Sequence, residues 1–242
     1  MATSVAIVGS SGRMGGLIDR MLSASDDFDV HARVGRHDSL ELLDGADVVI
    51  DVSVPAVSPG VVEAALDRRI PIVIGTSGWT SDRIAPVATR ITADPELTAL
   101  VIPNFSLGSA LATRFAELAA PHFESIEIVE AHHAGKTDSP SGTALRTAEL
   151  IAAARADLGP VAAPHADQRA RGQLVASVPV HSLRMSGVSA RQEVVLGGAG
   201  ETVRIVHETL SDESYEPGIL LALRAATSTT GLVVGLGALL GL

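Results

Sequence analysis

The sequence predicts an α/β protein in two parts: a doubly wound parallel sheet, and a second domain of the α+β class. Over roughly the first hundred residues, short β-branched runs alternate with amphipathic helical stretches, which is the pattern of βαβ units. Apolar residues make up 46% of the chain but aromatic residues only 2%. The core must therefore be built from Val, Ile, Leu and Ala, as in buried parallel sheets.

The elements of the first part follow one another in regular alternation. Five strands are expected, at Val5–Val8, Val30–Val34, Val48–Ser53, Ile72–Gly75 and Leu100–Ile102. Three helices are expected between them, at Gly12–Ala24, Pro59–Arg69 and Ser81–Ile91. Because crossovers between parallel strands are right-handed, these units predict a sheet with helices on both of its faces.

The pattern changes after Asn104, where the second domain is expected to begin. Its predicted elements are the helices Ser109–Ala120 and Thr143–Ala156 and the strands Ile126–Glu130, Ser177–Met185, Arg191–Leu196 and Thr202–His207. The glycine-rich connection Gly197–Gly200 indicates an antiparallel hairpin between the last two strands. A final helix, Pro217–Ala226, and the apolar tail Gly231–Leu242 are expected to return to the first domain, the tail as a docking segment. The predicted domains are residues 1–103 with 213–242, and residues 104–212.

Composition excludes several classes of function. The formal net charge of −10 argues against a nucleic-acid-binding protein, which needs a basic surface. The chain has no cysteine, which fits a reducing compartment and excludes thiolate chemistry. The apolar tail is interrupted by glycines and is too short to span a bilayer, and no targeting signal is apparent near Met1. We therefore expect a cytoplasmic protein that binds neither nucleic acid nor membranes.

A glycine-rich turn follows the first predicted strand. Glycine lets backbone N–H groups approach a pyrophosphate, and the following helix directs its positive end at it. The spacing is GxxGxxG, which also occurs in tight strand-to-helix turns without a ligand. Its place at the first turn of a parallel sheet favours a dinucleotide site in a Rossmann-type domain. The residues expected to contact the dinucleotide here are Gly9, Ser11, Gly12, Arg13, Met14 and Gly15.

The end of the second predicted strand indicates which dinucleotide binds. An acidic residue there usually holds the ribose 2′-hydroxyl of NAD, whereas arginine holds the 2′-phosphate of NADP. This chain has Arg33 and Arg36 and no acidic residue until Asp38. Two surface arginines are also common without such a role. We expect a preference for NADPH, with NADH as the alternative cofactor.

Three further turns are expected at the same edge of the sheet, where ligands bind in such folds. Ser53 ends the third strand, and Gly75-Thr76 ends the fourth, with open backbone and a hydroxyl that suit a nicotinamide carboxamide. The turn Asn104-Phe105-Ser106 lies where the domains join and is expected to form a wall of the nicotinamide site. Each turn is equally compatible with an ordinary loop, and the last with a helix cap.

The single lysine of the chain, Lys136, lies in a cluster of polar and titratable residues. The other basic residues among the 18 are arginines, which do not release a proton, whereas an ammonium has a pKa that its surroundings can move. His132 and His133 precede Lys136, and the predicted helix start Ser141–Thr143 follows with free N–H groups and two hydroxyls. The cluster predicts proton chemistry or the binding of a small anion that carries several acidic groups.

A metal centre or a purely structural role fits this cluster less well. Adjacent histidines also occur as structural residues or as metal ligands, but no further Cys, His or carboxylate spacing completes a zinc or iron site. We therefore expect no metal. A nucleophilic role for Ser141 is not favoured either, because no nucleophile elbow surrounds it.

The segment Glu127–Ala144 closely resembles the signature of the dihydrodipicolinate reductase (4-hydroxy-tetrahydrodipicolinate reductase) family, NAD(P)H enzymes of diaminopimelate and lysine biosynthesis. The resemblance covers nearly the full chain and includes Gly9–Gly15, Gly75-Thr76, Asn104–Ser106, Val180–Arg184, Gly200-Glu201 and His207-Glu208. It implies the reduction of 4-hydroxy-tetrahydrodipicolinate to tetrahydrodipicolinate with loss of water. It also implies a homotetramer joined through the sheet of the second domain.

The resemblance assigns roles to the lysine cluster. It implies that His132 and Lys136 are the acid/base pair of the reaction. It further implies that the carboxylates of a small dicarboxylate substrate are held by His133, Lys136, Ser141, Gly142 and Thr143. The chain departs from the family pattern at Gly35, where many relatives have an acidic residue, and at Asp212, where a basic residue is expected. The departure at Gly35 favours NADPH over NADH.

Two other functions remain compatible with the pattern. One is a different two-domain NAD(P)-dependent dehydrogenase of a small amino or dicarboxylic acid, against which the histidines, Lys136 and Pro140–Thr143 argue. The other is a non-catalytic NADPH sensor, which needs only the first domain and no proton donor.

Overall fold

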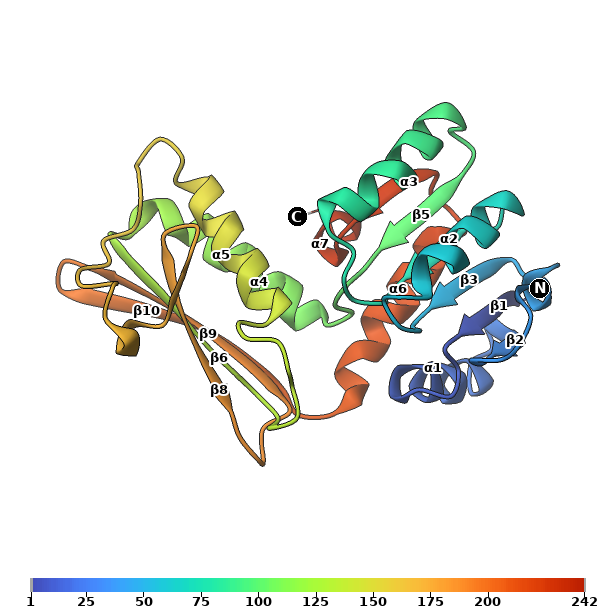
Figure 1. Cartoon of the computed structure of the whole chain (residues 1–242), viewed down its shortest axis with the longest axis horizontal. Helices are drawn as coiled ribbons and strands as arrows, with labels where there is room; N and C mark the ends of the chain where they lie inside the picture. Colours follow the sequence, from blue (N-terminus) through green and yellow to red (C-terminus); the bar gives the residue numbers. More distant parts are fainter. Residues whose placement is uncertain (1, 242) are drawn as a thin grey trace. The chain divides into compact units, whose positions relative to one another are not determined.

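The first structural unit is built on a parallel sheet of six strands. The computed structural model describes residues 2–241 of the chain. The strands of this sheet are β1 (Thr3–Val8), β2 (Phe28–Val34), β3 (Val48–Asp51), β4 (Ile72–Ile74), β5 (Thr98–Val101) and β11 (Gly231–Val234). They lie in the order β11-β5-β4-β3-β1-β2, and each neighbouring pair is parallel (Figure 1). The predicted doubly wound parallel sheet is confirmed.

Helices cover both faces of this sheet. They are α1 (Arg13–Ser23), α2 (Ser58–Asp67), α3 (Ser81–Ala93), α6 (Glu216–Ala226) and the short α7 (Leu236–Leu239). On one face α2 and α3 enclose strand residues such as Val49, Ile72 and Val101, while α1 and α6 contact the strands from the other face. Every residue of β3 and β4 is buried, which explains why both strands are apolar except for Asp51 at the end of β3.

The tail forms a sixth strand that the sequence did not predict. It was expected only to dock on the first domain, but Gly231–Val234 pairs in parallel with β5, from Gly231 opposite Thr98 to Val234 opposite Val101. Gly231 and Gly235 have φ values of 95° and 87°, a conformation that glycine adopts readily, and they turn the chain at both ends of the strand. Four apolar residues are too few to show a strand period in the sequence.

The second unit is a mixed sheet with helices on one face. Its strands are β6 (Ser125–His132), β7 (Gln173–Val175), β8 (Val178–Arg184), β9 (Ala190–Gly198) and β10 (Glu201–Thr209). They lie in the order β10-β9-β6-β8-β7, with β6 and β8 parallel and the other pairs antiparallel. The helices α4 (Leu107–Ala119) and α5 (Gly142–Ala154) lie over one face of this sheet and enclose Ile126, Ile128, Val180 and Leu196 (Figure 1).

The predicted α+β class and the hairpin are confirmed in this unit. β9 and β10 pair from Glu201 opposite Gly198 to Thr209 opposite Ala190. The short strand β7 was not predicted, because its three residues lie at the end of a polar stretch. One compact unit comprises the chain up to Leu107 and again from Tyr215, and the other comprises Gly108–Ser214. Each helix among the described residues is too short or too polar to cross a lipid bilayer.

The turn between β1 and α1 gives a direct test of packing. A Cβ atom on Gly15 would lie 2.2 Å from the carbonyl oxygen of Gly9 and 2.6 Å from Cα of Ser10, so the backbone of the turn must move to admit it. A Cβ atom on the next residue, Gly16, would meet only the guanidinium of Arg20, at 3.6 Å. The same substitution should therefore have opposite effects at these two helical positions.

We predict that Gly15→Ala lowers the free energy of unfolding by about 1–3 kcal/mol, the usual cost of overpacking. Gly16→Ala should leave it unchanged or raise it by up to ~1 kcal/mol, because alanine is the better helix former. Urea unfolding of the two variants beside the unsubstituted protein measures both effects. Equal stability of the two variants would contradict the proposed close approach.

Candidate active site

The turn after β1 lies where the order of the strands reverses. β1 is flanked by β2 on one side and β3 on the other, so the chain leaves it in one direction and returns on the opposite side. Open parallel sheets bind ligands at the carboxyl ends of such strands. Gly9 directly follows β1 and has a φ of 87°, and a Cβ built on it would lie 2.7 Å from the carbonyl oxygen of Val52 and 2.8 Å from Cα of Ser53. Only glycine fits this contact between the two loops.

The glycine-rich turn presents the start of a helix without a side-chain cap. Gly12 occupies the N-cap position of α1, no side chain caps the helix there, and its first turn contains no acidic residue. The first N–H groups of α1 and its positive end therefore remain available to an anion. The guanidinium of Arg13 lies 5.9 Å from the centre of the Tyr215 ring, within the range of a cation–π contact.

The backbone geometry of this turn is compatible with a dinucleotide site. The structure brings the six residues expected from the sequence into one strand-to-helix turn: Gly9, Ser11, Gly12, Arg13, Met14 and Gly15. Side chains at Gly9 or Gly15 would fill space that the backbone itself occupies. The result is a compact, uncapped helix start that fits a pyrophosphate group.

The two arginines at the end of β2 differ in their contacts. Arg33 forms an ion pair of 2.6 Å with Asp19 of α1. Arg36 is exposed in the turn that follows β2. The carboxylate of Asp38 accepts a hydrogen bond of 2.8 Å from the backbone N–H of Gly35. Of the two arginines expected to bind a 2′-phosphate, Arg33 is thus already paired with Asp19. The first acidic residue after β2, Asp38, is hydrogen-bonded to the backbone of the turn.

A buried carboxylate, Asp51 at the end of β3, ties together the other loops of this edge. Its side chain accepts hydrogen bonds from the N–H of Ser53, at 3.0 Å, and from the hydroxyl of Ser58. Ser58 in turn accepts a bond of 2.9 Å from the indole N–H of Trp79. The N–H groups of Gly75 and Thr76 donate to the carbonyl oxygen of Asp51 at 2.8 and 3.1 Å. Asp51 was not predicted to be a site residue.

The loops after β4 and β5 meet at Gly75. A Cβ atom on Gly75 would lie 2.5 Å from Cε2 of Phe105, so the Phe105 ring packs directly on this glycine. The side chain of Asn104 accepts a hydrogen bond of 2.9 Å from the N–H of Ser106. The structure therefore brings together the two turns that the sequence analysis assigned to the nicotinamide.

In the second unit a fully buried carboxylate, Glu130 near the end of β6, gathers donors from three segments. Its oxygens accept two bonds of 2.9 Å from the guanidinium of Arg184 on β8. They also lie 2.6 Å from Nδ1 of His132 and 3.1 Å from the backbone N–H of Ser141. Glu130 lies within the family signature, but neither Glu130 nor Arg184 was predicted to be a site residue.

The two histidines and the lysine occupy different surroundings. β6 ends at His132, whose side chain is partly buried beside Glu130, whereas His133 is exposed. The side-chain nitrogen of Lys136 lies 2.7 Å from a carboxylate oxygen of Asp138. Arg184 connects these groups, because the nitrogen that bonds Glu130 also donates to the carbonyl oxygen of Asp138 at 2.6 Å.

The helix start after the lysine loop forms as predicted. Ser141 is the N-cap residue of α5, and its hydroxyl accepts a bond of 3.2 Å from the N–H of Ala144. That hydroxyl keeps its own proton as a donor. No atom lies within 4 Å of a Cβ built on Gly142, so the approach to the first turn is open there. The N–H groups of Gly142 and Thr143 lie at the positive end of the helix.

Electrostatics favour an ionised Glu130 and a neutral His132. Burial raises the pKa of Glu130, but hydrogen bonds from Arg184, Ser182 and His132 outweigh it and hold the pKa below its ordinary value. Burial lowers the pKa of His132, and the positive charges of Lys136 and Arg184 lower it further, against the raising effect of Glu130. Burial raises the pKa of Asp138, but its bond with Lys136 prevails and lowers it.

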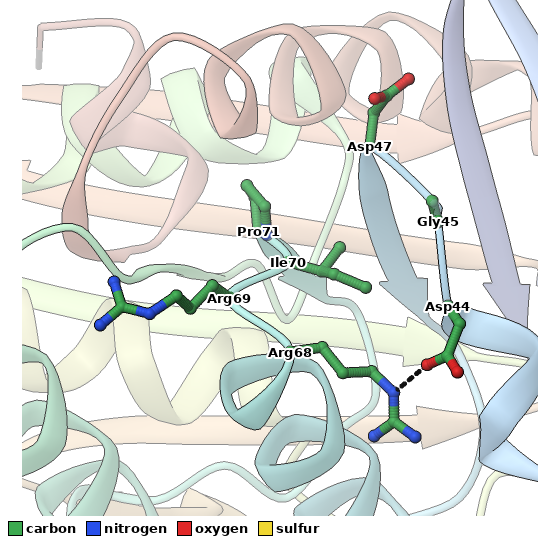
Figure 2. Close-up of a pocket in the computed structure, with 8 residues that line it drawn as sticks. Asp44, Gly45, Asp47, Arg68, Arg69, Ile70 and Pro71 are labelled. Carbon is green, nitrogen blue, oxygen red and sulfur yellow. Dashed lines mark hydrogen bonds and ion pairs between the residues drawn. The ribbon is translucent and has the colours of Figure 1, made fainter.

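A separate hollow of about 500 Å³ lies elsewhere on the first unit (Figure 2). It is formed by Asp44, Gly45, Ala46, Asp47, Arg68, Arg69, Ile70 and Pro71. These residues precede β3 and β4, at the amino ends of the strands, and none was predicted as a site residue. Arg68 points toward Asp44, at 2.6 Å, while Arg69 points away from it. Among the described residues, no three His or acidic side chains gather as metal ligands.

Comparison with known proteins decides the family. A family model described as dihydrodipicolinate reductase, N-terminus, matches residues 3–105, and one described as dihydrodipicolinate reductase, C-terminus, matches residues 108–240. The chain belongs to the dihydrodipicolinate reductase family. The resemblance inferred from the sequence motifs is confirmed.

Individual relatives match this chain over nearly its full length. The chain is 56% identical to a 4-hydroxy-tetrahydrodipicolinate reductase of Clavibacter sepedonicus over 240 residues, which cover 99% of this chain and 87% of the relative. It is 46% identical to one of Streptomyces griseus, over 96% of this chain and 95% of the relative. A solved structure described as dipicolinate-bound dihydrodipicolinate reductase from Paenisporosarcina sp. TG-14 matches with a TM-score of 0.84, 28% identity and coverage of 98% and 99%.

We predict that acidification destabilises the fold in two stages. The unfolded chain takes up a proton at His132 near the ordinary pKa of 6.5, whereas the folded protein does so only at lower pH, so stability falls as the pH drops below 6.5. Glu130 adds a second loss, which begins near its ordinary pKa of 4.5 and continues as the pH falls through the lowered pKa of the folded state.

Urea unfolding at a series of pH values measures this dependence. Because other carboxylates also contribute, the comparison with Glu130→Gln isolates the second stage, which the variant should lose. An identical dependence on pH in the two proteins would contradict the assignment.

Proposed function

We propose that this chain reduces 4-hydroxy-tetrahydrodipicolinate to tetrahydrodipicolinate, with loss of water, in lysine and diaminopimelate biosynthesis. Its family consists of oxidoreductases, and relatives at 46–56% identity carry this activity in their names. The structural observation that supports the proposal is that Glu130 bonds both His132 and the start of α5, with Lys136 in the loop between them. This arrangement suits the binding of one small anionic molecule. The related structure described as dipicolinate-bound supports a dicarboxylate ligand.

The helix start and the lysine loop supply the donors for the two carboxylates. The N–H groups of Gly142 and Thr143, the hydroxyl of Ser141 and the charge of Lys136 suit carboxylate oxygens. His133 adds an exposed imidazole in the same loop. Holding both carboxylates fixes the orientation of the ring, which raises the rate without any direct part in bond making.

The glycine-rich turn of the first unit would hold a reduced nicotinamide dinucleotide, which would provide the hydride for the reaction. Gly9–Gly15 would hold its pyrophosphate, and Ser53, Gly75, Thr76 and Asn104–Ser106 the nicotinamide ribose and ring. The fit rests on the uncapped start of α1 and on the glycine contacts described above.

Side chains of the second unit carry out the proton transfers. Loss of water requires a base to remove a proton from the ring carbon beside C4 and an acid to protonate the departing hydroxyl. Neutral His132 suits the first role, and the ammonium of Lys136 suits the second. When C4 has been reduced, His132 can return its proton to the same carbon, which restores the neutral imidazole. Lys136 regains from solvent the proton that it gave to the departing hydroxyl, which restores the ammonium. Acid/base catalysis of this kind contributes about 10²–10⁴-fold.

The direct test follows the oxidation of NADPH by the purified chain with the product of dihydrodipicolinate synthase as the substrate. Turnover supports the reductase. Binding of NADPH without turnover would indicate a sensor, and turnover only with other amino or dicarboxylic acids would indicate a different dehydrogenase. A substrate panel run in parallel separates these outcomes.

We predict that Lys136→Ala lowers kcat by about 10²-fold or more, because the charged donor of the cluster is lost. Its Kd for NADPH should change by less than about twofold, since Lys136 belongs to the second unit and the glycine-rich turn to the first. Stopped-flow kinetics and fluorescence titration of NADPH measure the two quantities. Unchanged turnover would contradict the role of Lys136.

We further propose that the enzyme prefers NADPH to NADH. Arg36 is exposed after β2, where a 2′-phosphate is held in such folds, and the position of the usual ribose-binding acid is occupied by Gly35. Arg33 lies on the same strand end but carries an ion pair with Asp19, so Arg36 is the better candidate for the phosphate.

We predict that Arg36→Ala raises KM for NADPH about tenfold or more, while KM for NADH changes by less than about twofold, because only NADPH carries the phosphate that a charge-assisted bond would hold. Arg20→Ala, at an exposed arginine of α1, is the control and should change neither value. Equal effects of Arg36→Ala on both cofactors would contradict the assignment.

We also propose a homotetramer joined through the open face of the second sheet. Both helices of this unit lie on one face (Figure 1), and the side chains of Leu174, Leu183 and Val206 on the strands of the other face are 43–49% exposed. Association would remove this apolar area from water. Sedimentation at the mass of four 24.8 kDa chains tests the proposal.

The absence of cysteine and the use of a reduced cofactor support a cytoplasmic location, which cell fractionation tests.

A further inference from the structure

We propose that Glu130 is a positioning residue for the reaction: it fixes the tautomer of His132 and links that histidine to the start of α5. The inference rests on the proposed function, in which His132 exchanges a proton with the substrate. It adds the group that holds His132 ready to do so.

The geometry around Glu130 determines which nitrogen of His132 carries the proton. Nδ1 of His132 lies 2.6 Å from Oε2 of Glu130. An ionised carboxylate only accepts hydrogen bonds, so Nδ1 must be the donor, and a neutral imidazole then has its lone pair on Nε2. Glu130 is fully buried and held on both oxygens by Arg184, which keeps it charged and immobile. His132 is thereby held with Nε2 ready to accept a proton.

The same carboxylate connects the base to the groups that hold the substrate. Its Oε1 accepts the N–H of Ser141, the N-cap of α5, at 3.1 Å. Arg184 also bonds the backbone of Asp138, whose side chain pairs with Lys136. A displacement of Glu130 would therefore shift His132, the start of α5 at Ser141 and the loop that carries Lys136.

A second carboxylate on β6 provides a matched control. Glu127 also bonds an arginine and a histidine, Arg171 and His181, the latter at 2.8 Å. Because it lies three residues from Glu130 on the same strand, its side chain projects from the opposite face of the sheet. It is also about one-third exposed, whereas Glu130 is fully buried. Glu127 thus shares the chemistry of the Glu130 cluster but not its contact with His132.

The test replaces each carboxylate by its amide. In Glu130→Gln the new N–H can donate to Nδ1 of His132, which would move the imidazole proton to Nε2 and remove the acceptor. ¹⁵N NMR of His132 distinguishes the two tautomers directly. We expect the Nδ1–H form in the unsubstituted protein and in Glu127→Gln, and the Nε2–H form in Glu130→Gln.

Kinetics supply the second readout. Glu130→Gln should lower kcat by about 10²-fold, with Kd for NADPH changed by less than about twofold. Glu130 raises the pKa of His132, whereas Lys136 and Arg184 lower it, so removal of Glu130 takes away the raising effect and leaves the lowering one. The acidic limb of the kcat profile should therefore move to lower pH in Glu130→Gln but not in Glu127→Gln. Glu130→Asp, which keeps the charge, should recover part of the activity.

Two results would overturn the proposal. One is an Nε2–H tautomer of His132 in the unsubstituted protein, a measurement that needs no variant to fold. The other is a folded Glu130→Gln variant with unchanged kcat and pH profile. If instead the unsubstituted chain fails to reduce the substrate, the proposed function fails, while the tautomer measurement still decides the arrangement of Glu130 and His132.

Discussion

A carboxylate that is taken fully out of water must find hydrogen-bond donors for its oxygens, and this requirement shapes both units of the protein. Asp51 meets it with donors from the β3–α2 loop and the start of α2, and its backbone carbonyl receives the turn after β4. Glu130 meets it with Arg184, His132 and the first turn of α5. In each unit a buried carboxyl group at a strand end therefore holds loops that carry candidate ligand-binding residues. These are Ser53 and Gly75-Thr76 in the first unit and His132 and Ser141 in the second.

The two carboxylates differ in how they are neutralised. Asp51 is held by neutral donors, the N–H of Ser53 and the hydroxyl of Ser58, whereas Glu130 faces the guanidinium of Arg184. A buried ion pair rarely adds stability relative to an apolar pair of the same volume. The presence of Glu130 and Arg184 at the ends of β6 and β8 thus fits a role in arranging reactive groups better than a role in stability alone.

Local patterns in the sequence predicted most of the fold and the outline of the site. The alternation of β-branched runs and helices predicted the parallel sheet, and the spacing from His132 to Thr143 predicted the lysine cluster and the helix start. The sequence could not show what Glu130 and Arg184 do, because they lie 54 residues apart and meet only when β6 and β8 pair. The ion pair between Arg33 and Asp19 and the strands β7 and β11 were missed for related reasons: a contact between elements, or too few residues to show a period.

The strand β11 also has a consequence for the order in which the protein is made. Its partner β5 precedes the whole of Gly108–Ser214 in the chain, so the first sheet cannot be completed until that segment has left the ribosome. The intervening unit is continuous and can fold as soon as it emerges, since domains generally fold as units during synthesis. Until β11 emerges and pairs with it, one edge of β5 stays unpaired. Unpaired strand edges in partly folded chains are sites of aggregation and of chaperone binding.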